Sequence, residues 1–172
     1  ESTKKFQTEI KDTGSQSVIA DVVKTLVAHV DSAGVSESER ADAVVSMVGS
    51  AVSALKDAAV NDDSSRIDSM KAIVDAAVSA IADAGVSSTS MTNVVADIAK
   101  SSLKSAAEAG VSQELIAKAA EAVTQVAVAS ATKLAETTGI QEIKATEISS
   151  AVVQNMVAAL ADAGVAKEAM AE

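Results

Sequence analysis

The sequence predicts an all-α fold, a compact bundle of about six helices with partial helices at both termini. Three observations indicate this. Apolar residues recur every three or four positions, which is the spacing of an amphipathic helix. Turn signals divide the chain about every 20 to 29 residues, and there is no proline to interrupt a helix. Because a chain of 172 residues, 48% of them hydrophobic, can bury a sizeable core, we expect residues 1–172 to form a single helical-bundle domain.

The expected joints between helices lie near residues 14, 34, 61, 85, 110, 139 and 164. Five of the seven glycines are followed by Val or Ile, and the string Ala-Asp-Ala-Gly-Val of residues 82–86 returns at residues 161–165. Glycine readily takes the left-handed conformation that ends a helix, and the next apolar residue packs under the turn. The offset of 79 residues between the two copies is about half the chain and indicates an older duplication.

Each predicted helix has one apolar face. In chain order, the inward-facing residues are Ile19, Val22, Val23, Leu26, Val27, Val30, Ala41, Val44, Val45, Val48, Val52, Leu55, Ala59, Ile67, Met70, Val74, Val78, Ile81, Met91, Val94, Val95, Ile98, Leu103, Ala106, Leu115, Ile116, Ala119, Val123, Val126, Leu134, Ile143, Ile148, Val152, Val153, Met156, Val157 and Leu160. The five methionines (47, 70, 91, 156 and 170) are expected to fill gaps in the core.

Polar residues mark the starts of the helices. Ser36 and Glu39 have the spacing of a capping box. Ser15 is expected to cap an earlier helix, and serines 87 and 88 and Ser112 are expected to cap later ones. Gly49 falls inside a helix, where it costs about 1 kcal/mol relative to alanine. Close approach of a neighbouring helix is the leading explanation, and a local bend is the second.

The charge excludes some classes of partner. A formal net charge of −10 argues against nucleic acid and against anionic membrane surfaces, while it favours solubility. Uncharged runs such as residues 43–55 are shorter than the roughly 18 residues of a membrane span. Without cysteine the chain forms no disulfide, and the redox compartment stays undetermined.

The sequence shows no residues arranged for catalysis. His29 is the one histidine and lies on a polar helix face, so we expect a solvated imidazole and no metal site. Asp62 and Asp63 lack the rest of a calcium-loop pattern and are interpreted as helix caps. Other carboxylates fall at helix ends or on solvent faces, namely Glu37, Glu39, Glu108, Glu114 and Asp162. We therefore predict no catalytic, cofactor-binding or metal residues, and no enzyme.

The ends of the chain suggest a module from a longer array. Residues 1–6 carry no initiator methionine and no apolar signal region. Residues 133–139 have an echo in residues 9–14, which indicates the tail of a helix, and residues 167–172 resemble the head of another. We expect one module excised from a tandem-repeat protein.

This pattern resembles the helical repeat modules of spider silk proteins, of the aciniform, tubuliform or pyriform kind. The features that carry the resemblance are Ala-Gly-Val at residues 33–35, 84–86, 109–111 and 163–165, Thr-Gly-Ile at residues 138–140, and the serine-rich helix starts. The resemblance implies a secreted, non-enzymatic structural domain that is stored soluble and assembles with its copies into a fibre or glue. The chain departs from the family in its charged residues and its single aromatic, Phe6.

Two functions follow from the sequence. The first is a structural repeat module whose partners are its own copies or neighbouring modules. Its valine-rich segments 18–30 and 120–131 would convert partly to β-structure on drawing, since valine favours strands. The alternative is a helical binding module, a lipid carrier or a surface adhesin, in which the Val/Ala faces line a ligand cavity instead of packing as core.

Overall fold

The computed structural model describes residues 16–30, 34, 36–55, 63–138 and 145–164. These residues form six α-helices and no strand, which confirms the all-α prediction. In chain order the helices are α2 (Gln16–Ala28), α3 (Glu37–Ala54), α4 (Asp63–Ala80), α5 (Ser88–Glu108), α6 (Gln113–Thr138) and α7 (Ala145–Asp162). The predicted partial helices at the two termini and the predicted cap Ser15 lie outside the described residues.

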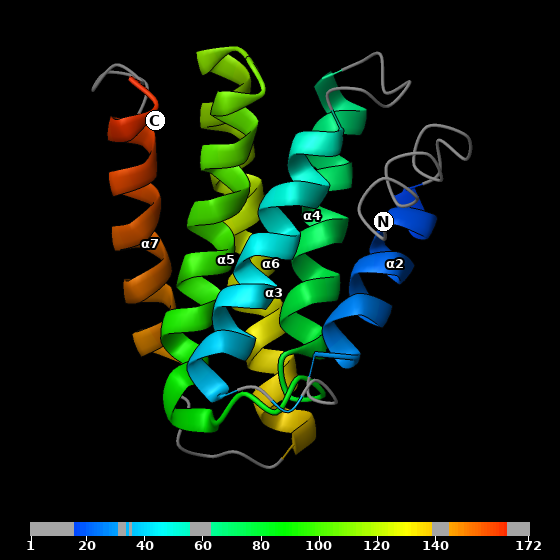
Figure 1. Cartoon of the computed structure of the whole chain (residues 1–172). Coiled ribbons are helices and arrows are strands. Elements are labelled where there is room, and N and C mark those ends of the chain that lie inside the picture. Colours follow the sequence, from blue (N-terminus) through cyan, green and yellow to red (C-terminus); the bar gives the residue numbers. More distant parts are fainter. Residues whose placement is uncertain (1–15, 31–33, 35, 56–62, 139–144, 165–172) are drawn as a thin grey trace.

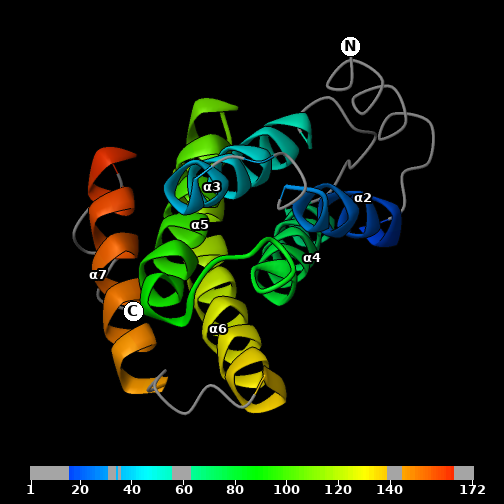
Figure 2. The ribbon, with the colours of Figure 1, turned by 60° about the horizontal axis from the view of Figure 1, so that its bottom comes forward.

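The helices form two layers. The most extensive contacts join helices that are two apart in the chain, so α2, α4 and α6 make one layer and α3, α5 and α7 make the other. Figures 1 and 2 show α7 at one end of the assembly and α2 at the other. The fold is therefore a stack of three helical hairpins, α2–α3, α4–α5 and α6–α7, in which each hairpin packs on its neighbours.

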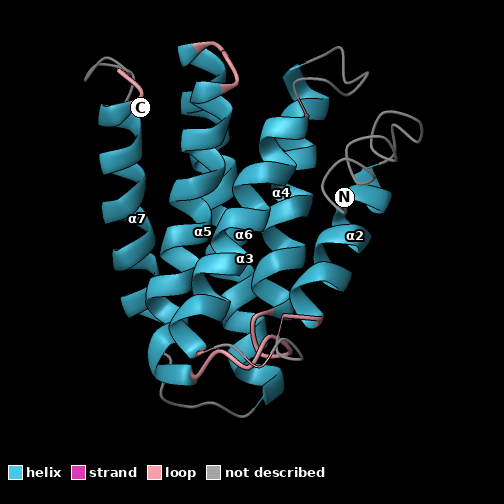
Figure 3. Ribbon diagram, viewed as in Figure 1, coloured by secondary structure: helices cyan, strands magenta, loops and turns pink. Residues whose placement is uncertain are grey.

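At the joints that the structure describes, the helices end at glycine as predicted. Gly34, Gly85, Gly110 and Gly164 all have a positive φ, between 67° and 80°. At Gly85 the glycine N–H donates to the carbonyl of Ala82, and the N–H of Val86 donates to that of Ile81, which are the two hydrogen bonds of a Schellman turn. Val86 is buried under this turn. The described turns gather at the two ends of the helices (Figure 3), and the joints predicted near residues 14, 61 and 139 lie outside the described part.

Most of the described residues on the predicted apolar faces form the core, and the exceptions include residues at both ends of the stack. Ile73, Ile81 and Ile98 are among the largest fully buried side chains. Val22 and Leu26 of α2 are only half-buried. The prediction that Val153 and Val157 point inward is wrong, because 48% and 53% of their surfaces are exposed. The reason is their place in the stack: α7 is the last helix of its layer in the described chain, and no described helix follows it.

Small residues bring α3 and α5 close together. A Cβ atom built on Gly49 would lie 2.9 Å from the hydroxyl oxygens of both Ser101 and Ser105. The Ser101 hydroxyl also donates to the backbone carbonyl of Val45 across the interface, at 3.2 Å. This confirms close approach of a neighbouring helix as the reason for Gly49.

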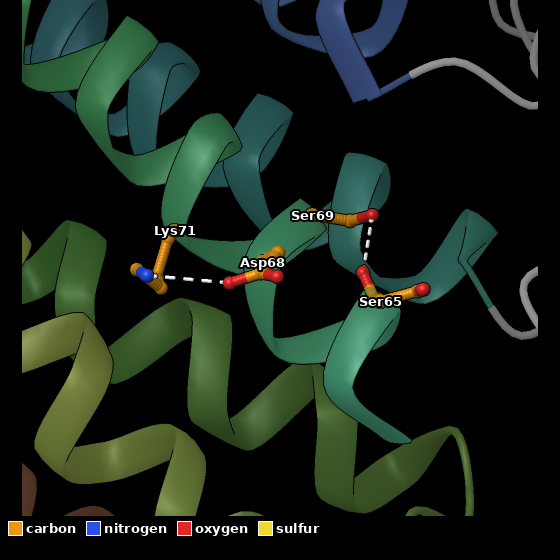
Figure 4. A network of polar contacts seen from close by, with 4 residues as sticks. All are labelled: Ser65, Asp68, Ser69 and Lys71. Atoms are coloured by element: carbon orange, nitrogen blue, oxygen red, sulfur yellow. Dashed lines mark hydrogen bonds and ion pairs between the residues drawn. The ribbon is translucent and has the colours of Figure 1, made fainter. Parts of the chain in front are cut away.

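Two buried serines, Ser69 and Ser102, bond to their own helix. The buried Ser69 donates its hydroxyl to the carbonyl of Ser65, one turn earlier, at 2.7 Å (Figure 4). On the exposed side of the same helix, Lys71 pairs with Asp68 at 3.2 Å. Satisfying a buried hydroxyl within its own helix removes most of the cost of burying it, so a serine-rich sequence still packs as a core.

Two of the predicted serine caps are confirmed. Ser36 and Glu39 form the capping box at the start of α3, and the Ser112 hydroxyl accepts from the Leu115 N–H at 3.3 Å. Ser87 stands at the N-cap of α5, but its side chain makes no cap hydrogen bond. The predicted N-cap position is therefore confirmed but the side-chain bond is not, because the Ser87 hydroxyl donates instead to the Glu37 carboxylate of α3.

A regular shift along the sequence relates the hairpins. Gly34 and Gly85 end the first helices of the first and second hairpins and lie 51 positions apart. Gly110 and Gly164 end the second helices of the second and third hairpins and lie 54 positions apart. By contrast, the letter-for-letter copies at residues 82–86 and 161–165 follow α4 and α7, which belong to different layers. The offset of 79 residues therefore does not join equivalent helices.

Candidate functional site

The start of α3 and the turn between α4 and α5 form a polar cluster. Glu37 accepts hydrogen bonds from both the hydroxyl and the backbone N–H of Ser87, at 2.7 and 3.1 Å. One turn along α3, Arg40 donates from Nη2 to the carbonyl of Gly85 at 3.1 Å. The two side chains bind residues of the same turn, so the cluster joins the first hairpin to the second.

The hydrogen bonds of this cluster act on the Glu37 carboxylate. Those from the Ser87 side chain, the Ser90 side chain and the Ser87 backbone, in that order, hold the pKa of Glu37 below its ordinary value of 4.5. Glu37 is therefore ionised at neutral pH and accepts protons poorly, whereas a general acid or base needs a pKa near the working pH. The geometry supports a structural role for the cluster.

The sequence indicated only part of this cluster. Glu37 was expected at a helix end, where the structure places it, but its partner lies 50 residues away. Gly85 and Ser87 were expected at a joint. Local sequence patterns locate the joint but do not show which helix packs against it. The pairing of this turn with Glu37 and Arg40 was therefore missed.

The other residues considered for chemistry lie apart from the cluster. His29 is exposed near the end of α2, and its Nδ1 lies 2.7 Å from the carbonyl of Thr25. Asp63 is the first residue of α4, and Asp62 lies outside the described residues. The four remaining carboxylates are exposed at different helix ends, Glu39, Glu108, Glu114 and Asp162. Among the described residues, no three His, Cys, Asp or Glu side chains are placed to hold a metal ion.

Two hollows among the described residues differ in size and in lining. An apolar pocket bounded by Val52, Met70, Ala106 and Leu115 has a volume of about 40 Å³, whereas ligand pockets measure roughly 300–1,000 Å³. An open groove of about 430 Å³ crosses α4 between α2 and α6. Charged residues of both signs line that groove, namely Asp21, Lys24, Asp75 and Lys133, so its chemistry does not suit an acyl chain.

The last feature is an exposed apolar stripe on α7. Val153 and Val157 are one turn apart on this helix, and Figure 2 shows α7 at the rim of the stack, in contact with α5 and α6. Of the surfaces that the described residues present, this stripe carries the largest exposed hydrophobic side chains. Adjacent exposed apolar residues of this kind make the stripe a candidate surface for packing against another protein.

No described helix is long and apolar enough to cross a membrane. No protein-family model matches the chain, and no curated protein is significantly similar to it. The features of the described residues that bear on function are therefore the stack of hairpins, the polar cluster and the exposed valines of α7.

Proposed function

We propose that the chain is a non-enzymatic structural module that assembles with copies of itself or with neighbouring modules, as a repeat unit of a secreted, silk-like fibre or glue. The observation that carries the proposal is a stack of like hairpins with an open apolar end. The hairpins repeat the same layered packing, and α7 leaves Val153 and Val157 uncovered. Secretion and the silk-like material rest on the resemblance of the Ala-Gly-Val joints to spider silk repeats.

The composition suits storage at high concentration followed by assembly. A net charge of −10 keeps copies apart at low ionic strength, and salt or mutual packing can then overcome this repulsion. Two helices that contain valine-rich segments, α2 and α6, are candidates for partial conversion to β-structure on drawing.

Drawing a concentrated solution of the whole chain tests the proposal. We expect a water-insoluble fibre whose infrared spectrum shows added β-structure. A solution that remains monomeric at every concentration and yields no solid on drawing contradicts the function. A fibre that stays purely helical would contradict only the conversion to β-structure.

The same preparation tests the alternative of a lipid carrier. The described apolar pocket, about 40 Å³, does not favour it. Stoichiometric retention of a fluorescent fatty acid through gel filtration would support the carrier at the expense of the structural module, and we expect the dye to elute separately.

A further inference from the structure

Each end of the stack lacks a neighbouring hairpin among the described residues. Residues one repeat apart, 51 positions between the first two hairpins and 54 between the last two, occupy equivalent places. The donors of two polar contacts follow this rule: Ser101 of α5 bonds back to α3 at Val45, and Asn155 of α7, 54 positions later, bonds back to α5 at Asp97, the residue after the equivalent of Val45. The exposure of equivalent residues can therefore be compared along the stack.

At the α7 end, buried positions become exposed. The places of Val153 and Val157 are taken in α5 by Ala99 and Leu103, which are fully buried. In α3 the same places are taken by Val48 and Val52, which are also buried. In both earlier helices another hairpin follows in the stack, and for α7 none follows among the described residues. We call Val153, Val157 and the neighbouring Gln154 the tail surface.

At the α2 end the converse holds. Four apolar residues there are only half-buried: Val22, Leu26, Ala43 and Met47. Their equivalents one hairpin later are all buried: Ile73, Ala77, Val94 and Ile98. The second hairpin has a hairpin before it and the first has none among the described residues. We call the four residues, with the exposed Thr25 and Ser50 beside them, the head surface.

We propose that the tail surface of one copy binds the head surface of a second copy, so that the α2–α3 hairpin of the second copy continues the two layers. One such contact covers both sets of incompletely buried residues at once. The interface is continuous with those inside the chain, because it repeats the packing of α3 on α5 and of α5 on α7. Since the two surfaces differ, the contact is head-to-tail and extends into an open filament instead of closing as a symmetric dimer.

This inference rests on the proposed function, because it names the surfaces through which the module would assemble. Two variants of matched charge distinguish a specific effect at the tail surface from a general effect of added charge. Val153→Asp with Val157→Asp adds two charges to the tail surface. Ser79→Asp with Asn93→Asp adds the same charge at exposed positions of α4 and α5, in the middle hairpin and away from both ends. A third variant, Thr25→Asp with Ser50→Asp, blocks the head surface at exposed residues.

Sedimentation velocity of the full chain, over a concentration series at about 0.15 M and about 1 M salt, provides the test. We expect the native chain and the Ser79/Asn93 variant to grow in mass with concentration, and more so at high salt. The tail and head variants should each remain at the monomer mass of 17.2 kDa. An equimolar mixture of the two should form dimers and nothing larger, because each supplies one intact surface. Circular dichroism verifies that every variant keeps its helices.

The outcomes distinguish the two proposals. A native chain that assembles together with a tail variant that assembles equally well overturns the head-to-tail contact and leaves the structural function standing. Loss of assembly in the tail variant but not in the head variant also overturns it, because the valines would then pair with themselves. A native chain that never assembles contradicts the structural function as well.

Discussion

Gly49→Ala tests whether small residues set the distance between α3 and α5. Alanine is favoured over glycine in a helix interior by about 1 kcal/mol, so an unhindered site would gain that stability. At Gly49 the new methyl group would meet the hydroxyls of Ser101 and Ser105 at 2.9 Å. Turning Ser101 away breaks its hydrogen bond to Val45, at a cost of about 0.5–1.5 kcal/mol, and overpacking a core costs about 1–3 kcal/mol in all.

The measurement is a double-mutant cycle by urea unfolding. In the native background we expect Gly49→Ala to lower the free energy of unfolding by about 0–2 kcal/mol, the overpacking cost less the helix gain. When Ser101 and Ser105 are both alanine, no other neighbour lies within 4 Å of the new methyl group, and the substitution should stabilise the chain by about 1 kcal/mol. Ser50→Ala on the exposed side of α3 is the control, expected within about 0.5 kcal/mol of native. Equal effects of Gly49→Ala in both backgrounds would refute the reasoning.

Two further predictions concern the joints. Gly110→Ala should lower the free energy of unfolding by about 1–2 kcal/mol from the left-handed backbone alone, since φ is +80° and no atom lies within 4 Å of the new Cβ. Gly110→Asn should lower it by less in the same urea titration. Equal losses of stability in the two variants would contradict this. Glu37→Gln should lower stability at about pH 7, where the native carboxylate is ionised. Because the pKa of Glu37 is lowered in the folded chain, its contribution is present above about pH 4.5 and is lost as the pH falls through the folded value. The stabilities of the variant and the native chain should therefore converge as the pH falls below the folded pKa of Glu37, and a constant difference would show that the Glu37–Ser87 contact does not depend on the charge.

The sequence predicted those parts of the fold that depend on neighbouring residues. Glycines followed by valine located the joints at residues 34, 85 and 110, because the Schellman turn is a local structure. The capping box of Ser36 was predicted for the same reason. Gly49 was interpreted as a point of close approach, and the structure adds that α5 makes the approach.

What the sequence did not predict depends on the order in which helices pack. The periodicity of α7 placed Val153 and Val157 with the buried residues, and their equivalents in α3 and α5 are buried. Only the position of α7 at the end of the stack exposes them, and amphipathic spacing carries no information about position. The partner of Glu37 was missed for a similar reason, because Ser87 belongs to another hairpin. The spacings of 51 and 54 were visible among the glycines, but the letter-for-letter copy 79 residues apart obscured them.

A disulfide between two copies tests the central claim most directly. The native chain has no cysteine, so each variant carries one thiol. Where α3 meets α5, a Cβ atom on Gly49 would lie 2.9 Å from the hydroxyl of Ser101. The equivalent pair across the proposed interface is Gln154 of one copy and Ser50 of the next. We expect oxidation of a mixture of Gln154→Cys and Ser50→Cys to give mainly the mixed dimer, because the repeated contact brings the Cβ atoms within the roughly 3.5–4.5 Å that a disulfide needs. Predominance of the Gln154→Cys homodimer, or no covalent dimer at concentrations where the chain assembles, would contradict head-to-tail stacking.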